Sequence, residues 1–148
     1  MYTAQVGRRG VVVSTIEESV PTRQAFHILH AMLSIAVVAL GVDKFFHLLA
    51  DWDACVAPQV ANAIAASMSP HRFMLIAGIV EIALGVLAAV KPRAGGAVLS
   101  MWLVATVVNV ALSRHHLDIV LIGLLLAAMA FAVSRLATAY ARVTNLPG

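Results

Sequence analysis

The stretch FMLIAGIVEIALGVLAAV, residues 73–90, decides the fold, because Glu81 is its only ionisable residue. Three further apolar stretches cover Phe26–Leu40, Ala97–Leu112 and Ile119–Val133. A membrane helix needs about 20 mainly apolar residues, and each stretch reaches that length with its interfacial flanks. The sequence therefore predicts an all-α integral membrane protein, built as an up-down-up-down bundle of four helices.

The composition supports this class. The 148-residue chain is 61% hydrophobic and only 11% charged, which is more apolar surface than one small water-soluble core can bury. We expect an N-terminal tail over 1–24, a bundle over 25–139 and a C-terminal tail over 140–148. Within the bundle, helices are predicted near 25–50, 70–90, 95–113 and 118–138. Residues 53–68 are expected to form a short surface helix or a loop.

Two local signals mark the predicted helix ends. Ser69-Pro70 is typical of an N-cap followed by proline at the first helical position. The run Lys91-Pro92-Arg93-Ala94-Gly95-Gly96 predicts a tight break between the second and third helices. Phe45, Phe46 and Trp52 suit a membrane interface, where aromatic rings lie at headgroup level.

The basic residues predict an orientation. Seven lie on the side of both tails and the second connection: Arg8, Arg9, Arg23, Lys91, Arg93, Arg135 and Arg142. Three lie on the opposite side with four aspartates: Lys44, Arg72 and Arg114. Because basic residues accumulate in cytoplasmic segments, both termini are expected in the cytoplasm. The net charge of +3 is scattered rather than clustered with aromatic residues, so we expect no nucleic-acid partner.

Cys55 is the single cysteine. One thiol excludes an internal disulfide, a CxxC redox pair and a cysteine-cluster metal site within one chain. An intermolecular disulfide stays open.

Glu81 is the most informative polar residue of the predicted spans. An unpaired, ionised carboxylate near mid-membrane costs several kcal/mol, so Glu81 should be protonated, paired or next to water. Lys44 is its natural partner, because it lies on the predicted inward stripe of the first helix. Asp43 is expected on the far side of that helix. Two readings of the pair stay open: a proton or quinone-headgroup site, which His47 could complete, or a structural ion pair that fixes helix packing.

Other polar residues extend this candidate quinone site. His30 lies on the same stripe of the first helix, and Trp102 and Asn109 lie on one side of the third helix together with Thr106 and Ser113. In the second helix, Gly78, Glu81, Gly85 and Ala88 share a narrow face, where small residues allow a neighbouring helix to approach closely.

Histidines and carboxylates gather where the first predicted connection meets the third. The candidate metal or haem ligands there are His47, His71, His115, His116 and Asp51, with Asp53 and Asp118 nearby. Imidazole and carboxylate groups suit zinc or copper, although no HxH, HxxxH or HExxH spacing occurs. A haem b held by His47 with His71 or His115 is a further alternative.

Three motifs resemble the DoxX-like family of small bacterial membrane proteins. The motifs are Gly41-Val42-Asp43-Lys44-Phe45-Phe46-His47-Leu48-Leu49, then Gly78–Leu87 followed by Lys91-Pro92-Arg93, and last Leu117-Asp118 opening a final helix that ends in Ser134-Arg135-Leu136-Ala137. Together they span about Phe26–Ala137. The start of the last helix departs from the family pattern at Val120–Gly123, which favours a partner-binding surface over a shared enzymatic site.

The resemblance implies a function and a location. It implies a four-helix protein of the bacterial cytoplasmic membrane that acts as an accessory or anchor subunit of an oxidoreductase complex linked to the quinone pool. The partners would be membrane lipid, other membrane or redox-enzyme subunits, and a second copy of the chain in a homo-oligomer. Two alternatives stay open: a quinone-interacting oxidoreductase in its own right, and a metal-handling or transport protein that uses the histidines named above.

Overall fold

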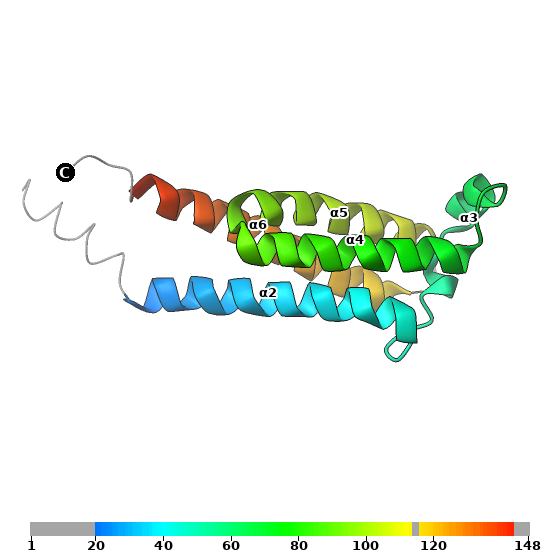
Figure 1. The fold of residues 1–148 in the computed structure, drawn as a ribbon, viewed down its shortest axis with the longest axis horizontal. Coiled ribbons are helices and arrows are strands. Elements are labelled where there is room, and N and C mark those ends of the chain that lie inside the picture. The colour runs from blue at the N-terminus through cyan, green and yellow to red at the C-terminus, as the bar shows by residue number, and fades with distance from the viewer. Residues whose placement is uncertain (1–19, 114–115, 144–148) are drawn as a thin grey trace, which may run out of the picture.

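The structure is a computed structural model that describes residues 20–113 and 116–143, and this part of the chain consists of helices joined by short loops, without a strand. Its four long helices are α2 (Val20–Phe46), α4 (Pro70–Val90), α5 (Pro92–Ser113) and α6 (Leu117–Val143). The connection between α2 and α4 contains a 3₁₀ turn, η1 (Asp53–Cys55), and a short helix, α3 (Pro58–Ile64). Figure 1 shows the long helices side by side.

The long helices pack as a ring in which α2 contacts α4 and α6, and α5 contacts the same two helices. The start of α2 and the end of α6 lie at one end of the bundle, and α3 lies at the opposite end, called here the α3 end (Figure 1). Two apolar clusters fill the interior. One is centred on Leu33, Leu99 and Ala130, and the other joins Trp52, Cys55 and Met74 near η1.

All four long helices are long and apolar enough to cross a membrane. Their most apolar segments are only 22–33% buried inside the bundle, so most of this surface faces outward. Exposed side chains on the four helices include Ile35, Ile79, Met101 and Leu125. Helices that are apolar on their outer as well as their inner faces are solvated by lipid rather than by water. The chain is therefore a membrane protein.

Several helix ends differ from the sequence-based prediction. Helix α2 begins at Val20, within the predicted tail, and ends at Phe46 rather than near residue 50. His47 ends it by adopting a left-handed backbone conformation (φ 53°), which an α-helix cannot continue. Helix α6 runs on to Val143, beyond the predicted end at 138. Residues 1–19 and 144–148, most of the two predicted tails, lie outside the described residues.

The start of α4 confirms the predicted cap. The Ser69 hydroxyl accepts a hydrogen bond from the backbone N–H of Arg72 at 3.3 Å, and Pro70 occupies the first helical position. The predicted break at 91–96 is shorter than expected, because only Lys91 lies outside the two helices. Helix α5 can begin at Pro92 because proline lacks the backbone N–H that a first turn leaves unpaired.

Two glycines bring α2 and α4 together. A Cβ at Gly78 would lie 2.7 Å from the Gly41 carbonyl oxygen, and a Cβ at Gly41 would lie 2.9 Å from the Gly78 carbonyl oxygen. Only glycine permits this approach of one backbone to the other. The predicted face of α4 is confirmed, since Gly78, Glu81, Gly85 and Ala88 are all buried. The close approach places Glu81 beside the last turn of α2.

Candidate functional site

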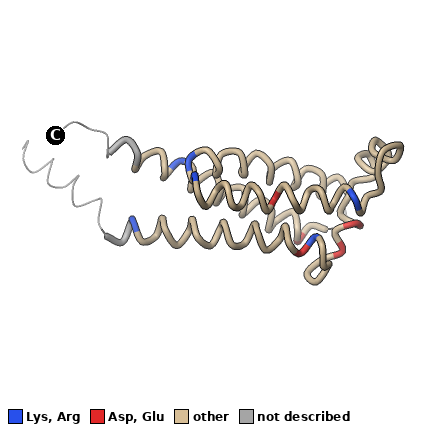
Figure 2. Tube along the Cα trace, in the orientation of Figure 1, with Lys and Arg blue, Asp and Glu red and all other residues tan. Residues whose placement is uncertain are grey.

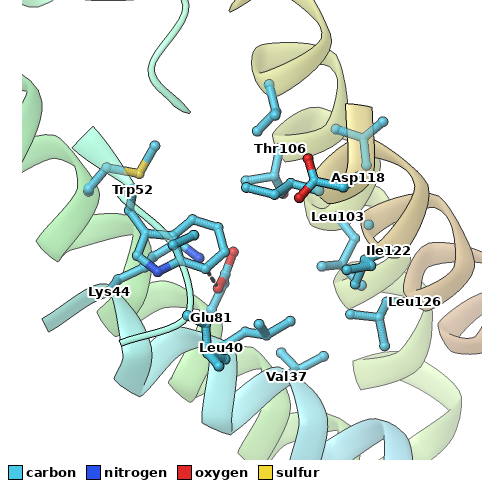
Figure 3. Close-up of a pocket in the computed structure, with 17 residues that line it drawn as sticks. Val37, Leu40, Lys44, Trp52, Glu81, Leu103, Thr106, Asp118, Ile122 and Leu126 are labelled. Carbon is cyan, nitrogen blue, oxygen red and sulfur yellow. Dashed lines mark hydrogen bonds and ion pairs between the residues drawn. The ribbon is translucent and has the colours of Figure 1, made fainter. Parts of the chain in front are cut away.

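A cavity of about 330 Å³ lies between the four long helices, toward the α3 end. It is lined mainly by apolar side chains, among them Val37, Leu103, Ile122 and Leu126. Its polar lining comes from Lys44, Glu81, Trp52, Thr106 and Asp118. Figure 3 shows Lys44, Trp52 and Glu81 on one side of the cavity, and Thr106 and Asp118 on the other.

The predicted pairing of Lys44 with Glu81 is confirmed. Lys44 Nζ donates a hydrogen bond to Glu81 Oε2 at 2.7 Å, and both side chains are almost fully buried. The ammonium group also lies 3.9 Å from the centre of the Trp52 ring, a distance that permits a cation–π interaction. The Lys44 ammonium group thus has the Glu81 carboxylate and the Trp52 ring as neighbours, at the wall of a mainly apolar cavity.

Asp43 was expected on the far side of the first helix, away from the inward stripe, and the structure shows that it is buried there by the loop that follows α2. Its Oδ2 accepts a hydrogen bond from Trp52 Nε1 at 2.7 Å. Its Oδ1 accepts hydrogen bonds from the backbone N–H groups of Leu48 and Leu49 at 3.0 and 3.1 Å. The chain reverses direction after Phe46, and this reversal brings the loop over Asp43. Asp43 therefore fixes the loop and places the Trp52 ring against Lys44.

Trp52 was expected at a membrane interface, yet only 6% of its surface is exposed. Phe45 and Phe46, in contrast, are exposed as an interfacial position requires. The side chain of Trp52 turns inward because Asp43 accepts the hydrogen bond from its indole N–H. A buried tryptophan usually finds such a partner.

Asn109, Trp102 and His30 do not line the cavity. The Asn109 amide instead holds the loop, because it accepts a hydrogen bond from the Ala57 N–H at 3.1 Å and donates one to the Cys55 carbonyl oxygen at 3.2 Å. Trp102 packs against the Trp52 cluster. His30 Nε2 lies 2.8 Å from the Ala88 carbonyl oxygen and joins α2 to the far end of α4. In the structure these three side chains connect neighbouring segments and do not form part of the cavity wall.

Two of the candidate metal ligands meet. His71 Nδ1 lies 3.0 Å from Asp53 Oδ2, and His47 Nε2 lies 3.6 Å from Asp53 Oδ1. Asp53, not Asp51, is the carboxylate between the two histidines, and Asp51 is exposed nearby. His116 immediately precedes α6 and is not part of this group. His115 lies outside the described residues.

The geometry of His47 and His71 does not fit a haem. Their rings lie nearly parallel, with centroids 5.7 Å apart, and both contact the Asp53 carboxylate. Two axial haem ligands point at one iron from opposite faces of the porphyrin. The arrangement found here fits a small cation instead.

Cys55 is fully buried in η1, with its thiol 3.4 Å from the Asp51 carbonyl oxygen. Burial, with a smaller contribution from the Asp51 carboxylate, raises the pKa of the Cys55 thiol from 9.0 to about 11. The folded state therefore holds this proton more tightly than the unfolded chain does. Its contribution to stability is complete below pH 9 and is lost as the pH rises toward 11.

We expect the folded protein to resist maleimide at pH 7.5. A pKa higher by two units lowers the thiolate fraction about 100-fold, and burial blocks access as well. Mass spectrometry after timed labelling in mild detergent measures the rate, with the protein in denaturing detergent as the control. Rapid labelling of the folded protein would contradict the buried position of the thiol. An intermolecular disulfide through Cys55 would then again be an alternative.

Neither a family model, nor a curated protein, nor a solved structure matches this chain. The resemblance to the DoxX-like family therefore stays a prediction.

Proposed function

We propose that this chain is a membrane subunit that binds a lipophilic quinone in the cavity and links an oxidoreductase complex to the quinone pool. The observation that carries the proposal is the Lys44–Glu81 pair at the wall of an otherwise apolar cavity. An amphipathic ligand with a polar ring and an apolar tail matches that division of the lining.

The size of the cavity supports a ring-sized headgroup. A volume of about 330 Å³ falls at the lower end of the range of about 300–1,000 Å³ that small-molecule pockets occupy. A quinone offers two carbonyl acceptors on a flat ring. Lys44 can donate to one carbonyl oxygen, and the Trp52 indole offers an aromatic face beside it.

The opposite wall supports recognition of the second ring oxygen. Asp118, in the first turn of α6, and Thr106 face the ion pair across the cavity (Figure 3). Reduction of a quinone to a quinol takes up two electrons and two protons. In this proposal a partner oxidoreductase supplies the two electrons, water supplies the two protons, and the carboxyl groups of Glu81 and Asp118 relay these protons to the ring oxygens.

The proposed setting is a bacterial cytoplasmic membrane, with an up-down-up-down topology and both termini in the cytoplasm. Basic residues gather at the end of the bundle that holds the start of α2 and the end of α6, and acidic residues concentrate toward the α3 end (Figure 2). The cavity then opens nearer the outer surface. The apolar outer faces of α2 and α6 are the surfaces offered to lipid, to a redox partner or to a second copy.

Tryptophan fluorescence tests quinone binding. The chain has two tryptophans, and Trp102→Phe leaves Trp52 as the sole reporter at the cavity wall. This substitution removes no hydrogen bond, because the Trp102 indole nitrogen has none to any described residue. We expect saturable quenching by a short-chain ubiquinone analogue, with a dissociation constant on the order of micromolar. An analogue without the two carbonyl groups should quench far less.

The double variant K44M/E81M distinguishes the quinone site from a purely structural ion pair. It removes both charges together and keeps similar side-chain volumes, so the bundle should still fold. We expect quinone affinity to fall at least tenfold, whereas an unchanged affinity would leave the pair with a packing role only.

Purification in mild detergent tests the subunit assignment. A protein that always migrates alone, and reduces quinone by itself when given an electron donor, would favour the oxidoreductase alternative.

A further inference from the structure

Three side chains from three separate segments meet at the α3 end, outside the cavity. His47 follows α2, Asp53 begins η1, and His71 lies in the first turn of α4. One ligand atom from each lies within 4.8 Å of the other two. We propose that this cluster, called the His47–Asp53–His71 cluster, binds a divalent metal ion of the zinc class.

Two buried atoms that make no hydrogen bond to any described residue carry the proposal. His47 Nε2 and Asp53 Oδ1 are both buried, and neither has a hydrogen-bond partner among the described residues. They face each other at 3.6 Å, which is too long for a good hydrogen bond. In a tetrahedral site with metal–ligand bonds of about 2.0–2.2 Å, neighbouring ligand atoms lie roughly 3.3–3.6 Å apart. The separation thus suits two ligands of one ion.

The donor set suits zinc chemically. Two neutral imidazoles and one carboxylate are ligands that zinc accepts readily, whereas magnesium and calcium prefer oxygen ligands throughout. His71 Nδ1, now 3.0 Å from Asp53 Oδ2, would exchange its contact with the carboxylate for the ion. The His71 side chain is 52% exposed, which leaves a path for the ion and room for a water molecule as fourth ligand.

The surrounding structure already fixes the backbone that carries two of the three ligands, His47 and Asp53. The turn that carries His47 is closed by the hydrogen bond from its N–H to the Asp43 carbonyl oxygen and by the Asp43 side chain. The segment that follows Asp53 is held by Asn109 through Cys55 and Ala57. Because this backbone is already ordered, metal binding costs little conformational entropy, which favours binding.

The proposal goes beyond quinone binding and does not depend on it. A bound ion would join the loop after α2 to the first turn of α4. The same loop supplies Leu49, Ala50 and Trp52 to the cavity wall, so the ion would restrain that wall.

Zinc titration of the full chain tests the proposal. The protein is purified without a polyhistidine tag, stripped with a chelator and titrated with zinc against a chromophoric competitor. We expect one zinc ion per chain, with a dissociation constant on the order of micromolar or tighter. Cobalt, used as a second probe, should give the visible absorption bands of a tetrahedral site. Magnesium should not compete.

Single variants locate the site. His47→Asn is chosen because asparagine tolerates the left-handed backbone at that position. His47→Asn, Asp53→Asn and His71→Ala should each weaken zinc binding at least tenfold and remove the cobalt bands. The matched controls are Asp51→Asn and His116→Ala, which remove a carboxylate and an imidazole outside the cluster. These two variants should leave the zinc affinity and the cobalt bands unchanged. A cluster with only a structural role predicts variants of lower stability and a wild-type protein without stoichiometric zinc. That result, or unchanged zinc binding in all three variants, overturns the proposal.

Discussion

Replacing Lys44 with methionine should destabilise the bundle by about 3–5 kcal/mol, because it leaves the Glu81 carboxylate buried without its partner. Lys44 supplies the hydrogen bond to Glu81 at 2.7 Å, and both side chains are nearly inaccessible. The remaining carboxylate must be protonated or draw water into the cavity, and both responses cost free energy. Unfolding by sodium dodecyl sulfate in mixed micelles, followed by circular dichroism, measures the loss.

The double variant K44M/E81M provides the comparison for Lys44→Met. Replacing both members of a buried ion pair with apolar residues of similar volume is often neutral or stabilising, so most of the lost stability should return. Arg72→Met removes an exposed cation near the start of α4 and should change stability by less than about 0.5 kcal/mol. If Lys44→Met were no less stable than the double variant, Glu81 would not depend on Lys44 for its place in the bundle.

Asp43→Ala should cost roughly 3 kcal/mol and detach the loop from the bundle. The carboxylate accepts hydrogen bonds from the Trp52 indole and from two backbone N–H groups. A hydrogen bond to a charged group contributes about 1.5–3 kcal/mol, and the two backbone N–H groups can bind water once the loop detaches, so the total stays near the upper end of that range for one bond. The Trp52 indole N–H would then be buried without an acceptor. We expect Trp52 to leave the cavity wall and its emission, measured with Trp102→Phe in place, to shift to longer wavelength.

The control for Asp43→Ala is Asp51→Ala, which removes an exposed carboxylate from the same loop. This control should leave stability and Trp52 emission unchanged. If Trp52 in Asp43→Ala still emitted at the wavelength of a buried indole, packing against Met74 and Ala77, rather than the hydrogen bond to Asp43, would hold the indole in place. Quinone affinity should fall in Asp43→Ala, since Trp52 lies on the cavity wall.

The candidate site could be predicted only in part. Glu81 stands out because ionisable residues are costly inside an apolar helix, and the inward stripe of the first helix points to Lys44. Helical periodicity also places Asn109 and Trp102 on one side of their helix, but it does not show what that side faces. Asn109 turns out to bind the loop backbone instead of lining the cavity.

The partners of Asp43 and Asp53 could not be predicted, for a related reason. Asp43 lies in the last turn of α2, but its hydrogen-bond partners lie in the loop that follows, and Asp53 lies in that loop itself. The spacing of 100° per residue therefore does not predict their neighbours. The left-handed turn at His47 sends the chain back over Asp43 and brings Asp53 between two histidines. Aspartates at or just after the end of an apolar helix indicate that the chain leaves the membrane there, but they do not specify the direction of the turn.

The sequence by itself determined that the chain forms four long apolar helices, where α4 begins, and that Lys44 pairs with Glu81. These features depend on composition, helical period and the cost of charge in lipid, which act locally or along a single helix. Only the tertiary structure decided which side chains line the cavity and which carboxylate meets His47 and His71. Those contacts depend on how closely α2 approaches α4 at Gly41 and Gly78 and on the path of the loop between them. Both arise from packing between segments distant in sequence.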